Sequence, residues 1–280
     1  EGIPTFQPQT TEALQTAVDL WVSDSASAVA AYGDINTWDV SLITDMSELF
    51  RYKETFNDDI SNWDVSNVTN MYRMFNEANN FNQDISGWDV SSATNMRRLF
   101  NVANSFNQDL SSWDVSNVTT MESMFKEADS FNQDLSNWNT SNVTNMKEIF
   151  QGADIFNGNI STWDVSSVTT MQRMFTHSDN FNQDISGWDV SSVTSMSEMF
   201  WGTDSFNQNI SSWDVSAVTS MYYMFYSAES FDQNLSSWDV SNVIYMEGMF
   251  GGTDALSDEN KCFIHSSFQS NDAWPYDWSE

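Results

Sequence analysis

The sequence predicts an α/β solenoid, a leucine-rich-repeat-like stack of about nine coils, each built from a strand, a turn and a short helix. Tryptophan recurs every 25 residues from Trp38 to Trp238 without insertion or deletion, and a fixed period of this length is typical of stacked coils. Within each unit the apolar spacing changes from strand-like to helix-like. Apolar residues make up 40% of the chain and aromatic residues 15%, which is enough to build a continuous core.

The strand is predicted from the first half of each unit. In one unit Ile60, Trp63, Val65 and Val68 follow the spacing of a turn that leads into a short strand in leucine-rich repeats. Successive strand residues point to opposite faces, so Trp63 and Val65 are expected to share the buried face.

The short helix is predicted from the second half. Met71, Met74, Phe75 and Ala78 fall at i, i+3, i+4 and i+7, which is one stripe of a helix. Methionine recurs at the first of these positions and phenylalanine at the third in every unit. A methionine stripe at this spacing is more typical of core packing than of a metal-binding surface, and we interpret it as core.

One solenoid domain is expected over residues 1–280, with an N-terminal cap at 1–33, the repeat array at 34–257 and an irregular C-terminal cap at 258–280. Thr10 or Thr11 can begin a capping helix whose apolar stripe runs from Leu14 to Trp21. Asn57 recurs in the next six units. A side-chain amide at this corner is expected to join the backbones of successive coils, which is a structural role.

The repeated motif Phe-Asn-Gln-Asp-Ile-Ser-x-Trp-Asp-Val-Ser-x-Val-Thr-x-Met-x-x-Met-Phe resembles the BspA-like leucine-rich-repeat surface proteins, whose 25-residue unit also occurs in mycoplasma lipoproteins. The resemblance covers roughly residues 33 to 257. It implies an extracellular or cell-surface protein with a role in adhesion or host contact, and it carries over no catalytic residues.

The charge of the chain narrows the classes of partner. There are 40 acidic residues against 9 basic ones, for a formal net charge of −31. Nucleic acid and anionic membranes would be repelled, and cations or basic surfaces are favoured. No apolar run is long enough to span a bilayer, so membrane insertion is not expected. A single cysteine, Cys262, excludes an internal disulfide framework.

An acidic column is the predicted binding face, because the residue between the buried tryptophan and valine of each strand must point outward. Neighbouring carboxylates repel one another, so either hydrogen bonds from adjacent serines or bound calcium should compensate them. The column consists of Asp39, Asp64, Asp89, Asp114, Asp164, Asp189, Asp214 and Asp239.

A second group of oxygen donors lies at the coil corners, in an alternating pattern that suits calcium. The group varies between units and lacks the glycine of a known calcium loop, so the pattern is weak. The candidate ligands are Asp129, Asn132, Asp134, Asp179, Asn182 and Asp184. Seven further sites match the Asn-x-Ser/Thr glycosylation signal: Asn67, Asn117, Asn139, Asn142, Asn159, Asn209 and Asn234.

These features predict a non-catalytic recognition or adhesion scaffold, extracellular or at the cell surface, whose acidic face meets a protein or a glycan. An alternative is a structural subunit of a self-associating extracellular assembly. The regular threonine column from Thr44 to Thr219 leaves an ice-binding protein as a third interpretation. An enzyme is not expected, because an active site brings unlike groups together in a pocket and these units are alike.

Overall fold

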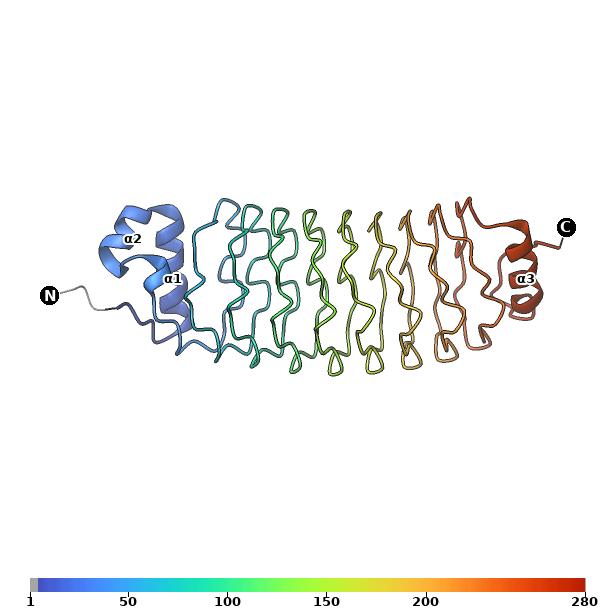
Figure 1. The fold of residues 1–280 in the computed structure, drawn as a ribbon, viewed down its shortest axis with the longest axis horizontal. Helices are drawn as coiled ribbons and strands as arrows, with labels where there is room; N and C mark the ends of the chain where they lie inside the picture. Colours follow the sequence, from blue (N-terminus) through green and yellow to red (C-terminus); the bar gives the residue numbers. More distant parts are fainter. Residues whose placement is uncertain (1–4, 280) are drawn as a thin grey trace.

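The computed structural model describes residues 5–279 and shows one long rod of stacked coils with helices at both ends (Figure 1). The chain winds from the N-terminal end of the rod to the opposite end, each coil lying beside the one before it. Residues 1–4 and 280, at the extremes of the two predicted caps, lie outside the described residues.

Helices α1 (Thr11–Ser23) and α2 (Ser25–Tyr32) cover the first coil. The side chain of Thr10 accepts from the backbone N–H of Ala13, which caps the start of α1. The hydroxyl of Thr11 donates to the carbonyl of Asp45 at 2.8 Å. A backbone group on the open side of the first coil is thereby satisfied. A short 3₁₀ helix, η1 (Ile35–Thr37), leads into the coils.

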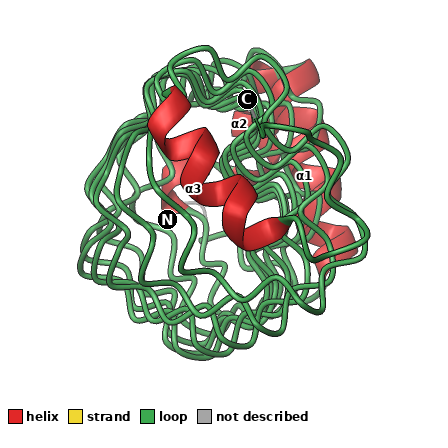
Figure 2. Ribbon diagram, turned by 90° about the vertical axis from the view of Figure 1, so that its right-hand side faces the viewer, coloured by secondary structure: helices red, strands yellow, loops and turns green. Residues whose placement is uncertain are grey.

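Helix α3 (Asp258–Phe268) crosses the other end of the rod (Figure 2). Ser257 caps its first turn, and Ile264 and Phe268 are buried against the last coils. Cys262 lies on the exposed side of this helix and is a free thiol.

The predicted strand at Trp63 and Val65 is wrong, although both side chains are buried as expected. Within residues 5–279 the coils are joined in parallel by single bridges that fall several residues later, at Asn70. The bridged residues are Asp45, Asn70, Asn95, Thr120, Asn145, Thr170, Ser195, Ser220 and Tyr245.

The predicted short helix in each coil is also wrong, because consecutive tight turns take its place. The N–H of Met74 donates to the carbonyl of Met71, and that of Ala78 to Phe75, both at 3.1 Å. The N–H of Arg73 instead reaches the next coil, at the carbonyl of Arg97, at 3.0 Å. A helix would use nearly all of these N–H groups inside its own segment and would leave none to join the coils.

The turns require a left-handed backbone at two positions in each coil. Arg73 and Glu77 have φ of 54° and 59°, at the third position of a turn, where a type II turn needs a positive φ. Glycine occupies such positions at Gly152, Gly202, Gly248 and Gly252, whereas Val102 adopts φ of 58° with a β-branched side chain.

Columns of identical side chains fill the middle of the rod. The rings of Phe75 and Phe100 are stacked with centroids 5.6 Å apart, and Phe75 packs on Phe81 at 4.0 Å. The methionines of the predicted helical stripe, such as Met71 and Met74, are fully buried. The core positions were therefore correct even though the backbone that carries them is not helical.

The tryptophan column also joins the coils through hydrogen bonds. The indole N–H of Trp138 donates to the carbonyl of Leu110, 28 residues earlier, at 2.9 Å. The same bond recurs in each coil from Trp63 to Trp238, at 2.8 to 3.2 Å. A buried carbonyl is thus satisfied by a side chain that also fills the core.

The asparagine corner has the structural role predicted for it. The side-chain oxygen of Asn82 accepts from the backbone N–H of Asn107 at 2.9 Å and from the amide of Gln108 at 2.8 Å. Each corner oxygen therefore holds the coil that follows.

Candidate functional site

The predicted binding column of aspartates is engaged in local hydrogen bonds. The Oδ1 of Asp64 accepts from the backbone N–H of Ser66 at 3.1 Å and from its hydroxyl at 2.6 Å. The same backbone bond, from the serine two residues on, is made by Asp39, Asp89, Asp114, Asp164, Asp189, Asp214 and Asp239. Of the two compensations considered for this column, the structure contains the hydrogen bonds from serine.

These bonds favour the charged carboxylate. Hydrogen bonds from the following serine lower the pKa of Asp89, Asp114 and Asp164 below the ordinary value for aspartate. The column therefore keeps its negative charge at neutral pH and presents one anionic row along the rod.

The predicted corner ligands do not converge on one point. Asp134 accepts from the N–H of Ser136 at 2.8 Å, and Asp184 from that of Ser186 at 3.0 Å. The side-chain oxygens of Asn132 and Asn182 each accept from the backbone of the following coil. Across residues 5–279, no group of three or more His, Cys, Asp or Glu side chains is placed to hold a metal ion. Calcium binding stays a prediction.

Asp129 and Asp179 belong to a different row of carboxylates, which also includes Asp154 and Asp204. Burial raises the pKa of Asp154, Asp179 and Asp204, and each is raised further by the carboxylate of the preceding coil. His177 opposes this effect in all three. The row therefore holds mutual repulsion that the serine-bonded column relieves.

The predicted glycosylation sites lie on the surface, with Asn159 half-buried and the others exposed. The amides of Asn67, Asn117 and Asn142 donate to serine carbonyls of the preceding coil at 2.7 to 2.9 Å. Modification of these sites stays a prediction.

A third surface differs from coil to coil, and we call it the variable face. It consists of the four positions that lie 9, 10, 13 and 14 residues after each repeat tryptophan, such as Lys147, Glu148, Gln151 and Gly152 in one coil. Nearly all the arginines and lysines of the array lie on this face. The core and the corners repeat, and these positions do not.

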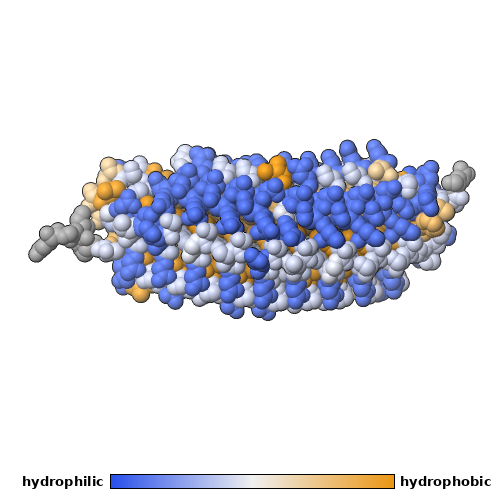
Figure 3. Space-filling model, in the orientation of Figure 1, coloured by the Kyte–Doolittle hydropathy of each residue, from blue (hydrophilic) through white to orange (hydrophobic). Residues whose placement is uncertain are grey.

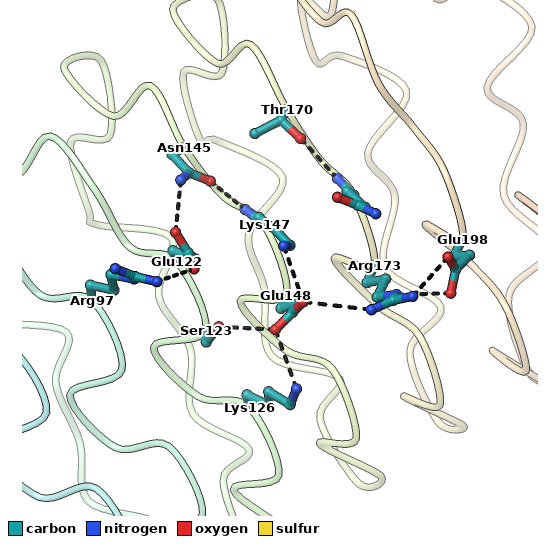
Figure 4. A network of polar contacts seen from close by, with 11 residues as sticks. Arg97, Glu122, Ser123, Lys126, Asn145, Lys147, Glu148, Thr170, Arg173 and Glu198 are labelled. Atoms are coloured by element: carbon teal, nitrogen blue, oxygen red, sulfur yellow. Dashed lines mark hydrogen bonds and ion pairs between the residues drawn. The ribbon is translucent and has the colours of Figure 1, made fainter. Parts of the chain in front are cut away.

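A network of ion pairs occupies the middle of the variable face (Figure 4). The carboxylate of Glu148 lies 3.2 Å from Lys126, 3.6 Å from Lys147 and 3.9 Å from Arg173. Arg173 also contacts both carboxylate oxygens of Glu198, at 2.8 and 3.0 Å. Burial pushes the pKa of Glu148 upward, but Lys126 and Lys147 outweigh it and hold that pKa below its ordinary value.

Further along the variable face the charged residues give way to aromatic ones. Trp201, Tyr222, Tyr223 and Tyr226 line a surface hollow of about 320 Å³. The centroid of Tyr223 is 5.7 Å from Trp201, 4.4 Å from Tyr222 and 4.8 Å from Tyr226. We call this group the aromatic hollow.

Glycines of the following coil make room for these rings. A Cβ at Gly248 would lie 2.8 Å from the ring of Tyr223, and a Cβ at Gly251 would lie 2.8 Å from that of Tyr226. Sequence reasoning missed the aromatic hollow because it examined what the coils share. The available signal was a set of aromatic residues at surface positions, each followed 25 residues later by glycine.

Most of the face seen in Figure 3 is hydrophilic, with hydrophobic residues in small separate areas. Among the described residues, no helix is both long and apolar enough to cross a membrane.

Comparison with known proteins identifies a family. No curated protein matches the chain. Among solved structures, a crystal structure of a TLR13–ssRNA13 complex has 9% sequence identity and a TM-score of 0.24. That likeness covers 90% of this chain, which spans only 49% of the TLR13 chain. The family described as "Mycoplasma protein of unknown function, DUF285" matches at residues 21–138, 108–197 and 183–273. These overlapping matches span nearly the whole chain, which therefore belongs to the DUF285 family.

Proposed function

We propose that this protein is a non-catalytic recognition scaffold that binds basic partners, outside the cell or at the cell surface. The observation that carries the proposal is the contrast between a core repeated in every coil and a variable face that differs in every coil. Repeated residues such as Trp138 and Asn132 are used to hold the coils together. The residues of the variable face are free of that task and can be specific for a partner.

The acidic column supports the proposal in a second way. Its carboxylates lie in one row along the rod and stay charged, so they attract positively charged surfaces over a distance of about one Debye length, roughly 8 Å at physiological salt. In this scheme the acidic column speeds the encounter and the variable face determines which partner remains bound. The resemblance to surface-protein repeats supports a location outside the cell.

The proposal can be tested with the full chain and a panel of peptides of equal length that are basic, neutral or acidic. We expect the basic peptides to bind, with an affinity that falls as salt rises. An acidic-column variant carrying Asp64→Asn, Asp89→Asn and Asp114→Asn should bind more slowly, with the dissociation rate little changed. Equal affinity for all three peptide classes, or for none, would refute the proposal.

Self-association is a second candidate function, favoured by one observation. Ile244 and Tyr245 on the last coil are 62% and 58% exposed, at the end of the rod that α3 crosses. A second copy could cover these side chains. Sedimentation velocity across a hundredfold range of concentration tests this, because a constant monomer would exclude it.

A further inference from the structure

The variable face supplies its own cations over most of the array. Arg51 lies 2.7 Å from Glu48, Arg97 lies 2.8 Å from Glu122, and Arg173 lies 2.8 Å from Glu198. After Arg173 the sequence contains no further lysine or arginine until Lys261, in α3. The coils that carry the aromatic hollow therefore contribute no cation of their own to this face.

The same face also shows how the chain binds a guanidinium group. The guanidinium carbon of Arg51 lies 4.3 Å from the ring centroid of Tyr52, and that of Arg73 lies 4.9 Å from the ring of Tyr72. Arg97 lies 5.7 Å from the Tyr72 ring on its other side. Each of these arginines also contacts a carboxylate. Ring and carboxylate together form the arginine site that this surface repeats.

The aromatic hollow has both parts of such a site without the arginine. Its four rings surround the hollow, and Glu247 occupies the position of Tyr222 in the next coil. The backbone N–H of Tyr223 donates to the carbonyl of Glu247 at 2.9 Å, which fixes the two coils side by side. Glu247 is exposed, and no cation among the described residues lies within ion-pair distance of it.

We propose that the aromatic hollow binds an arginine side chain of a basic peptide, with Glu247 as the counter-ion. The inference rests on the proposed function and specifies its site. A planar guanidinium can stack on a tyrosine or tryptophan face while it donates to a carboxylate, which the compact ammonium of lysine does less well. The net charge of −31 further favours a cation over a neutral ligand at this position.

The test uses the full chain and three fluorescein-labelled peptides that differ at a single residue: arginine, lysine or citrulline, the neutral isostere of arginine. Fluorescence anisotropy at low salt gives the affinities. We expect the arginine peptide to bind several-fold more tightly than the lysine peptide, and the citrulline peptide at least about tenfold more weakly than the arginine peptide.

The variants are taken from other coils of the same chain, so that the fold should tolerate them. Tyr223→Ser introduces the residue found at Ser123, and Tyr226→Thr the residue found at Thr176, at equivalent positions. The double variant should bind the arginine peptide about tenfold more weakly, and Glu247→Gln about threefold more weakly. The matched control is Tyr245→Ser, an exposed tyrosine of the last coil outside the hollow that becomes the residue found at Ser220. It should stay within about twofold of wild type.

Three outcomes would overturn the inference. Equal binding of the arginine peptide to wild type and double variant would place the site elsewhere but would leave the proposed function intact. Absence of binding by any basic peptide would refute both. Binding of a neutral oligosaccharide such as chitohexaose, lost in the double variant while the arginine peptide is unaffected, would make the hollow a glycan site.

Discussion

Replacement of Trp138 by phenylalanine tests whether the indole hydrogen bonds hold the coils together. Trp138 is 2% exposed, and its N–H donates to the buried carbonyl of Leu110 at 2.9 Å. Phenylalanine would keep a ring in the column, stacked below Trp163 at about the present 6.1 Å. It would, however, leave the Leu110 carbonyl without a donor.

The expected cost follows from these contacts. An orphaned buried acceptor costs about 1–3 kcal/mol, and loss of part of a buried indole adds about 1 kcal/mol of packing. Trp138→Phe should therefore lower the free energy of unfolding by about 2–4 kcal/mol. Urea unfolding followed by circular dichroism measures the change.

Trp201→Phe provides the matched control, because Trp201 is half-exposed in the aromatic hollow and lies outside the tryptophan column. The same chemical change should cost less than about 0.5 kcal/mol there. Equal unfolding free energies for the two variants would refute the role assigned to the indole N–H. Trp113→Phe should match Trp138→Phe, since its indole makes the same bond at 3.1 Å.

Three further predictions concern backbone strain and charge. Val102→Gly should raise the free energy of unfolding by about 1 kcal/mol, because valine at φ of 58° is strained and glycine is not; thermal melting beside Gly152→Ala, expected to shift the other way, checks the sign. Asp179→Asn should stabilise by less than about 1 kcal/mol at pH 7. The folded-state pKa of Asp179 is raised, so the penalty of its charge develops as pH rises above the unfolded pKa; an advantage that persists at pH 2.5 would contradict this. Glu148→Gln should destabilise by about 1–3 kcal/mol at pH 7. The folded-state pKa of Glu148 is lowered, so its contribution is present above the unfolded pKa and is lost as pH falls through the folded pKa; urea unfolding at pH 7 and pH 2.5, with Glu247→Gln as the control, measures the difference.

The core could be predicted from the sequence because stacking places residue i beside residue i+25. Once Trp63 and Phe75 were recognised as members of columns, their burial followed from the period alone. The same logic identified the corner asparagines. A buried column is specified by which residues repeat, and it does not depend on the exact path of the backbone between them.

The backbone path itself was mispredicted because two different conformations bury the same side chains. Met71, Met74, Phe75 and Ala78 face inward in a helix and equally in successive turns. The distinguishing signal was glycine at Gly152 and Gly202, inside the expected helix, where it would destabilise a helix by about 1 kcal/mol relative to alanine. Those glycines mark positions that need a positive φ.

The aromatic hollow was harder to predict than the core for a related reason. Trp201 and Tyr226 lie on adjacent coils, and the space beside Tyr226 exists because Gly251 follows one period later. A surface site of this kind is composed of departures from the repeat. A search for what the coils have in common passes over it.

The hydrogen bonds between coils make the length of this rod adjustable in steps. Because the N–H of Arg73 reaches Arg97 and that of Arg98 reaches Glu122 in the same way, excision of any 25 consecutive internal residues would reconnect equivalent positions. A loss of 24 or 26 would instead shift every later donor out of register. Gene duplication in whole units can therefore lengthen or shorten the molecule and move the aromatic hollow nearer to or farther from α1, without redesign of any joint.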